Sequence, residues 1–193
     1  MKFINFFKHL KKVIIHRKWV RYYCFHAGLF WQGLTHDLSK FHPTEFIESV
    51  RYYDGRRSPI DVCKERNEYS KAWLHHRGRN KHHWEYWVDN FEKGMTPIRM
   101  PYKYAVEMFC DFLGAGRAYL DKSYTAEKEC AWWQEKRKVV VMHPQTKTFI
   151  DECFEEYRHR ACVINPLDLK EIWLDTLRTE RNVRNYEQTA DRH

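Results

Sequence analysis

The chain has 193 residues, of which 43% are hydrophobic and 17% aromatic, and it carries a formal net charge of +8. A chain of this length can bury a sizeable core and ordinarily forms one domain, here 1–193. No segment approaches the roughly 18 apolar residues of a membrane-spanning helix, and Lys8, Lys11 and Lys12 interrupt the early apolar stretches, which excludes a transmembrane segment and a signal-peptide core and favours a cytoplasmic protein.

The first predicted element is an amphipathic helix over about 3–27, in which His16, Val20, Tyr23 and Ala27 recur on one face. The first 36 residues contain no acidic residue, and their basic residues are Lys2, Lys8, Lys11, Lys12, Arg17, Lys18 and Arg21. Such a block either attracts the phosphates of a nucleotide, a nucleic acid or an anionic membrane, or it is an ordinary solvated helix face.

Three further helical segments and a loop are predicted before residue 95. A helix begins at Pro43, because proline favours the first turn. Residues 54–66 contain turn-forming residues followed by a charged run, which indicates a loop. A short helix over 68–77 then ends at Gly78, and Asn80 caps another helix that runs toward Gly94.

A longer helix is predicted from Pro101 to about Tyr119. One stripe of this helix is formed by Tyr104, Met108, Asp111, Ala115 and Ala118. Further helices are predicted over 125–137, 145–160 and 167–187, and only 139–142 resembles a strand. The predicted fold class is therefore an all-α bundle. Its C-terminal helical extension, about 121–193, ends in an extra helix that packs on the domain or forms a subunit contact in a homo-oligomer.

The six cysteines are scattered and form no C-x-x-C pair: Cys24, Cys63, Cys110, Cys130, Cys153 and Cys162. This spacing favours reduced, mostly buried thiols, as in a cytosolic protein. The sequence also contains no glycine-rich phosphate loop, no G-x-S-x-G and no H-E-x-x-H, so nothing in it supports another common class of enzyme equally well.

The most informative segment contains the adjacent pair His36 and Asp37, which follows a hydrophobic helix end. Such a pair offers an imidazole nitrogen and a carboxylate oxygen to one cation, although a doublet alone is a weak signal. Two other residues strengthen it. His16 lies on the amphipathic face upstream, and Asp111 lies within an apolar helix, where a carboxylate is costly to bury without a partner.

Both supporting residues also have ordinary interpretations. Asp111 can form a salt bridge with Arg117 or Lys103, and His16 can be a surface histidine within the basic block. The sequence alone leaves open whether these residues have such ordinary roles or bind one ion together.

The order His16, His36-Asp37 and Asp111, with Lys40 three residues after the doublet, resembles the HD superfamily of metal-dependent phosphohydrolases. The stretch from His36 to Lys40 is similar to that family's His-Asp-x-Gly-Lys, with Ser39 in place of glycine. The resemblance covers about 10–120 and implies an HD-domain-like helical bundle in which these two histidines and two aspartates bind a divalent metal. A narrower, little-characterised bacterial and phage HD-like family is also similar, over 33–46, 72–87 and 100–119.

Four histidines fall within nine residues: His75, His76, His82 and His83. If Gly78 breaks the helix, members of the two pairs can converge across the turn. This resembles HD proteins that hold two metals through an added His and a His-His doublet, which implies His76 and His83 as further ligands. In the alternative, these histidines, with His82 foremost, bind the phosphate of a substrate together with Arg77, Arg79 and Lys81. A stacked surface of aromatic and His residues remains a third reading.

The resemblance implies hydrolysis of a nucleotide or another small phosphoester by a metal-activated water. Asp37 is expected to hold metal and water, and Glu45 to move protons. The cations Lys40, Arg79 or Lys81 are expected to bind the substrate and to neutralise its developing charge. Mixed imidazole and carboxylate ligands suit one or two ions of Mn, Fe, Co, Ni or Zn better than Mg, which stays possible.

A second functional class stays open. The chain can be a non-catalytic module with the HD fold that sequesters a nucleotide, or contacts nucleic acid through the basic N-terminal helix. A protein that only binds is free to lose one of the four core residues, and none is missing here, which favours the enzyme.

Overall fold

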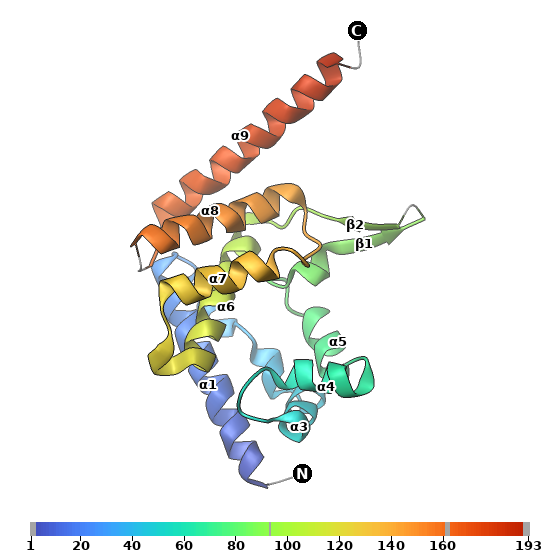
Figure 1. The fold of residues 1–193 in the computed structure, drawn as a ribbon, viewed down its shortest axis with the longest axis vertical. Helices are drawn as coiled ribbons and strands as arrows, with labels where there is room; N and C mark the ends of the chain where they lie inside the picture. Colours follow the sequence, from blue (N-terminus) through green and yellow to red (C-terminus); the bar gives the residue numbers. More distant parts are fainter. Residues whose placement is uncertain (1–2, 93, 161–162, 191–193) are drawn as a thin grey trace.

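The computed structural model describes residues 3–92, 94–160 and 163–190. In this part of the chain the fold is predominantly α-helical, which confirms the predicted class (Figure 1). The α-helices are α1 Phe3–His26, α2 Phe30–Thr35, α3 Pro43–Tyr52, α4 Pro59–Asn67, α5 Lys71–Arg77, α6 Tyr102–Leu120, α7 Ala126–Lys136, α8 Pro144–Arg160 and α9 Pro166–Ala190. None of the helices among these residues is both long and apolar enough to cross a lipid bilayer.

Most helix starts follow local sequence signals. Pro43, Pro144 and Pro166 are the first residues of their helices, and Pro101 lies directly before α6. Proline suits these positions because its missing N–H would have no partner there in any case. The Ser70 hydroxyl accepts a hydrogen bond from the Trp73 amide at the start of α5, which satisfies one of the free donors of that helix.

Three predicted segments were wrong. The 54–66 loop contains most of α4, which begins at Pro59 directly after Ser58, a sequence signal for a helix start. The helix expected from Asn80 toward Gly94 is replaced by a 3-10 turn, η2 Trp84–Trp87, and an antiparallel hairpin, β1 Val88–Phe91 with β2 Gly94–Pro97. The strand expected over 139–142 does not form. Its residues alternate between exposed and buried, but they pair with no neighbouring strand.

The centre of the fold is the packing of α1 against α6, which lie side by side (Figure 1). Their closest approach is at Gly114, where an added Cβ would lie 2.4 Å from Val20 Cγ2 and 2.9 Å from the Val20 backbone nitrogen. Glycine has no Cβ, so Gly114 permits this close packing of the two helices. The contact lies one helical turn from His16 on α1 and from Asp111 on α6, so it sets how near these two side chains come.

We expect Gly114→Ala to destabilise the protein by about 1–3 kcal/mol, the usual cost of overpacking, despite the better helix propensity of alanine. The methyl group must push the Val20 backbone away, which also separates His16 from Asp111. Urea unfolding of the purified variant measures the effect. Adding Val20→Ala removes the closest clashing atom and should restore part of the loss, whereas an unchanged midpoint for Gly114→Ala alone would contradict the close crossing.

The C-terminal helices pack on the same core. Trp133 of α7 stacks on Phe154 of α8, with ring centroids 5.3 Å apart, and Phe154 contacts Phe109 of α6. Leu169 and Trp173 bury the first half of α9 against α8. The predicted extra helix is confirmed, and Figure 1 shows that it extends beyond the rest of the fold.

The buried, reduced state expected for the cysteines is also seen for five of them: Cys24, Cys63, Cys110, Cys130 and Cys153. The sixth, Cys162, lies outside the described residues.

Candidate metal centre

The structure brings together the four residues of the HD-like pattern. His16 projects from α1, His36 and Asp37 follow α2, and Asp111 lies on α6. All four are buried. His16 Nε2 lies 3.3 Å from Asp37 Oδ2 and 3.1 Å from Asp111 Oδ1. His36 Nε2 lies 3.3 Å from each of the same two oxygens.

The ordinary alternatives for these residues are not observed. Arg117 donates to the Tyr23 hydroxyl at 3.0 Å instead of pairing with Asp111, and the Lys103 ammonium lies over the Tyr104 ring. His16 is 8% exposed and is therefore not a surface histidine.

A tight turn after α2 aims His36 and Asp37 at the centre. Asp37 adopts a left-handed conformation, with φ 53° and ψ 29°, which aspartate tolerates better than most residues. Arg17 fixes the turn from outside, because its Nε donates to the His36 carbonyl at 2.8 Å and its Nη2 to the Leu34 carbonyl at 3.0 Å. This member of the basic block therefore has a structural role.

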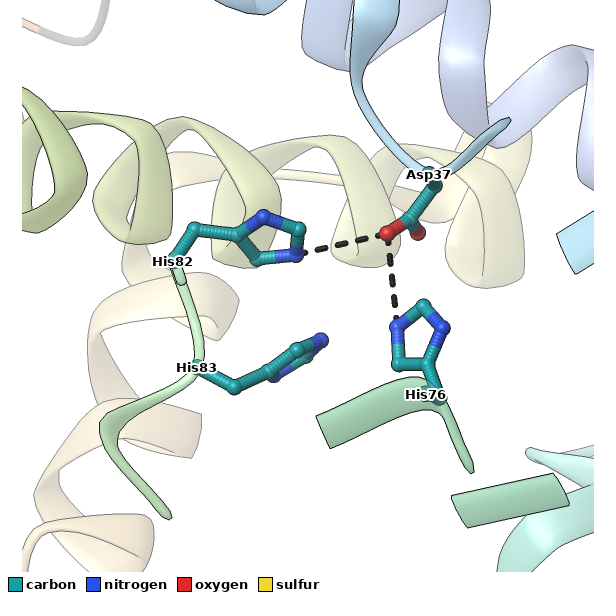
Figure 2. A group of neighbouring side chains, drawn as sticks. All are labelled: Asp37, His76, His82 and His83. Atoms are coloured by element: carbon teal, nitrogen blue, oxygen red, sulfur yellow. Dashed lines mark ion pairs between the residues drawn. The ribbon is translucent and has the colours of Figure 1, made fainter. Parts of the chain in front are cut away.

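The histidine-rich segment supplies a second set of donors. Gly78 caps the end of α5, and the chain turns so that His82 and His83 face back toward His76. His76 Nε2 and His82 Nε2 each lie 3.3 Å from Asp37 Oδ1. Figure 2 shows these two rings and that of His83 around one space beside Asp37. The predicted convergence across the turn is thus present, whereas His75 stacks on His42 outside it.

Three groups of donors have ligand atoms within 4.8 Å of one another, and Asp37 belongs to two of them, whereas the third consists of His36, His82 and Glu107. The first donor group comprises His16, His36, Asp37 and Asp111, and the second donor group comprises Asp37, His76, His82 and His83. The Oδ2 atom of Asp37 faces imidazoles of the first group and Oδ1 faces imidazoles of the second. One carboxylate is therefore shared between the two groups.

Two further carboxylates fix the imidazole rings from behind. Glu107 Oε1 lies 3.0 Å from His36 Nδ1 and 3.1 Å from His82 Nδ1, and Glu45 Oε2 lies 2.7 Å from His76 Nδ1. A carboxylate only accepts hydrogen bonds, so each Nδ1 carries a proton and donates it. The opposite atom, Nε2, is thereby directed toward Asp37, which is the orientation that metal-ligating histidines adopt.

The electrostatics favour ligand-competent forms for several of these groups. Burial lowers the pKa of His83 well below its ordinary value, and burial together with Lys40 lowers that of His76, so both rings are neutral. Burial opposes ionisation of the two aspartates. Even so, the facing imidazoles, joined by Lys40 at Asp37, hold the pKa of Asp37 and Asp111 well below the usual range. Ionised carboxylates and neutral imidazoles are the forms that bind metals.

Five buried polar atoms at this centre have no hydrogen-bond partner within the described residues: His36 Nε2, Asp37 Oδ1, His76 Nε2, His82 Nε2 and His83 Nε2. Buried polar atoms are normally paired, because desolvation without a partner costs roughly 1–3 kcal/mol for each atom. These five converge on one place and are ligand atoms of the two donor groups. His36 belongs to the first donor group, His76, His82 and His83 to the second, and Asp37 to both, so cations held by these groups would satisfy the five atoms and the residues fit a metal centre.

Comparison with known proteins places this geometry in a family context. The profile of a family of unknown function (DUF5662) matches residues 5–156. The chain belongs to the DUF5662 family. The match includes every residue of both donor groups and stops before α9. No curated protein and no solved structure matches the chain.

In this DUF5662 chain a cavity of about 190 Å³, here called the first cavity, opens beside the donors. Lys40 lines it, and its Nζ lies 3.0 Å from Asp37 Oδ2. Burial opposes the charged form of Lys40, but Asp37 and Asp111 raise its pKa to about 12. A fixed positive charge therefore stands at the edge of the centre, where the sequence predicts a phosphate contact.

The structure also places the residues of three other predicted roles. Arg79 and Lys81 are exposed and do not line the first cavity; the Lys81 ammonium lies over the Tyr86 ring instead. Both follow the end of α5 in the turn that directs the neighbouring histidines inward. His82, predicted to contact substrate, belongs to the second donor group. Glu45 lines the first cavity and receives hydrogen bonds from His75 and His76, so it orients these two rings.

Glu107 was not predicted from the sequence. It is 6% exposed and lies among Val106, Met108 and Phe109, four residues before Asp111. That spacing puts both carboxylates on one helix face. The sequence signal that could have identified Glu107 is a second carboxylate on the apolar helix face that carries Asp111.

Proposed function

We propose that this protein is a metal-dependent phosphohydrolase that acts on a nucleotide or another small phosphoester. The observation that carries the proposal is the division of inward-facing ligand atoms into two groups by the carboxylate of Asp37. Paired metal sites of this kind are common in enzymes that cleave phosphate esters. The resemblance of His16, His36-Asp37, Asp111 and Lys40 to the HD superfamily supports the same reading.

The donor chemistry narrows the choice of ion. The second donor group has three imidazoles and one carboxylate, and the first has two of each. Imidazole-rich sites favour Mn, Fe, Co, Ni or Zn, whereas Mg prefers oxygen ligands and retained waters. We therefore infer two transition-metal ions, one in each group.

A divalent cation bound here supplies Lewis-acid stabilisation of a phosphoryl oxygen and lowers the pKa of water. The chain's own residues do the remaining work. Lys40 holds a positive charge beside Asp37 and lines the cavity, so it attracts the phosphate and offsets charge that develops on its oxygens. Glu107 and Glu45 keep the imidazoles in one orientation. Burial of most donor side chains limits the contact of the centre with bulk water.

The test is metal analysis of the purified full chain, followed by a hydrolysis screen. The panel contains phosphomonoesters, cyclic nucleotides and dinucleotides, each with Mn, Fe, Co, Ni, Zn or Mg. We expect up to two ions for each chain and hydrolysis that a chelator removes and added metal restores. Activity that is insensitive to chelation would contradict the proposal.

Two lysines give a matched comparison. Lys40→Ala should reduce kcat/KM about 10²-fold, since its charge faces the phosphate, whereas Lys81→Ala should change it less than about twofold, as is usual for an exposed residue away from a site. If the loaded wild type hydrolyses nothing on the panel yet binds a nucleotide tightly, the non-catalytic module is the correct reading. Weaker binding at higher salt would then implicate the basic residues of α1.

A further inference from the structure

A second cavity, of about 520 Å³, adjoins the first. Ser58, Ala115 and Tyr119 line both cavities, so the two lie side by side along α6. Ala115 and Tyr119 follow Asp111 by four and eight residues. At 1.5 Å per residue they lie about 6 and 12 Å along the helix axis from Asp111. This is the distance range over which a molecule with its phosphate at the donor groups would extend its organic part.

The second cavity has aromatic walls. Phe112 of α6 and Trp132 of α7 line it and contact each other, with ring centroids 5.3 Å apart and an interplanar angle of 62°. Tyr119 forms the boundary with the first cavity. Aromatic side chains in a partly open cavity favour a flat ring, because stacking a base on one contributes about 1–3 kcal/mol.

One polar group in these walls is not explained by the fold. Glu129 of α7 lines the second cavity and is 3% exposed. Its side chain has no hydrogen bond or ion pair with any residue of the described part of the chain. Its carboxyl lies against Gly116, where an added Cβ would come within 1.7 Å of Oε2, so the fold leaves room for it at this point. A carboxyl that is so little exposed and has no partner is costly to the fold, and because Glu129 lines the cavity, a ligand there can pair with it.

The protonation of Glu129 suits recognition of a heterocycle. Burial raises its pKa to about 8, so at neutral pH the group is mostly the protonated acid. A protonated carboxyl presents one O–H donor and one carbonyl acceptor side by side. The edges of nucleobases carry the complementary pair of an acceptor next to a donor.

We propose that the second cavity binds the base of a nucleotide whose phosphate lies at the donor groups, and that Glu129 is the residue that selects the base. The assignment of the phosphate end rests on the proposed phosphohydrolase function. The aromatic walls hold the ring, and Glu129 pairs with its edge. The span of about 6 to 12 Å along α6 leaves the sugar between the two cavities.

Nucleosides without phosphate test this site independently of catalysis. Adenosine, guanosine, cytidine and uridine are titrated into the full chain by calorimetry. We expect one of them to bind better than the others, and Glu129→Leu to weaken its binding at least about tenfold, the equivalent of one hydrogen bond. Glu129→Gln keeps a donor and an acceptor and should stay within about threefold of wild type on the same scale. Glu135→Leu, at an exposed position of α7, is the control and should have no effect.

Absence of binding by every nucleoside, or equal binding by Glu129→Leu and wild type, would overturn the base site. A larger loss of nucleoside affinity in Glu129→Leu than in Glu129→Gln indicates that the side chain recognises the base. Thermal melting of both variants shows whether either one has a folding defect. The hydrolysis screen fails or succeeds separately. Selective nucleoside binding without any phosphoester hydrolysis would support the base site and contradict the proposed phosphohydrolase. Hydrolysis without nucleoside binding would support the phosphohydrolase and contradict the base site.

Discussion

Asp37→Asn is expected to abolish metal-dependent phosphoester hydrolysis, with a loss of at least about 10³-fold in kcat/KM. Asp37 is the residue common to both donor groups, and each of its oxygens faces imidazoles of a different group. Removing its charge therefore weakens both ion sites. Asparagine has nearly the same size and also tolerates the left-handed backbone at this position, so the fold should survive.

The metal content of the variants tests whether both donor groups depend on the carboxylate of Asp37. We expect about two ions for each wild-type chain, fewer than one for Asp37→Asn and about one for His83→Ala, because His83 belongs only to the second donor group. Circular dichroism should show unchanged helicity in both variants. An Asp37→Asn protein that still retains two ions would show that the groups do not depend on this carboxylate.

Glu107→Leu is expected to lower metal affinity and activity about 10- to 100-fold, the usual effect of removing a residue that orients metal ligands. The Glu107 carboxylate accepts from the Nδ1 atoms of His36 and His82, one from each donor group. Leucine leaves both N–H groups unpaired and both rings free to turn. Glu107 is a positioning residue, so its loss acts through the histidines.

Metal titration distinguishes this positioning role from a general loss of structure. Activity of Glu107→Leu should recover as the metal concentration rises, because the ligand atoms remain in place. Glu107→Gln keeps one acceptor oxygen and should lie between wild type and Glu107→Leu. If saturating metal restores nothing and the melting temperature falls sharply, Glu107 would be a core residue without a role in metal binding.

The convergence of the four residues of the first donor group could be predicted from the sequence, but the role of Glu107, which orients two of the imidazoles, could not. Local patterns identify the His36-Asp37 doublet, His16 on the amphipathic face of one helix, and Asp111 within an apolar helix. The four histidines near Gly78 also indicated convergence. Which of them point inward depends on the turn after α5, and this is why His82 was predicted to contact a phosphate.

Helices with strong end signals were predicted well, whereas aromatic and charged segments were not. The helix after Pro101 has an apolar stripe that fixes both its type and its extent. Residues 80–97 contain Trp, Tyr and His that suit a helix or a strand equally, and here the pairing of Val88–Phe91 with Gly94–Pro97 decides the outcome. Such pairing depends on contacts that a local pattern does not contain.

The contacts of Arg17 have a mechanical consequence. His16 belongs to α1, and its neighbour Arg17 fastens the turn that carries His36 and Asp37. Three of the four residues of the first donor group are therefore attached to one helix, and only Asp111 comes from α6. A small rotation of α1 against α6 would therefore change the distance between Asp111 and the other three residues of the first donor group. Because Asp37 belongs to both groups, the same rotation would move a residue of the second donor group.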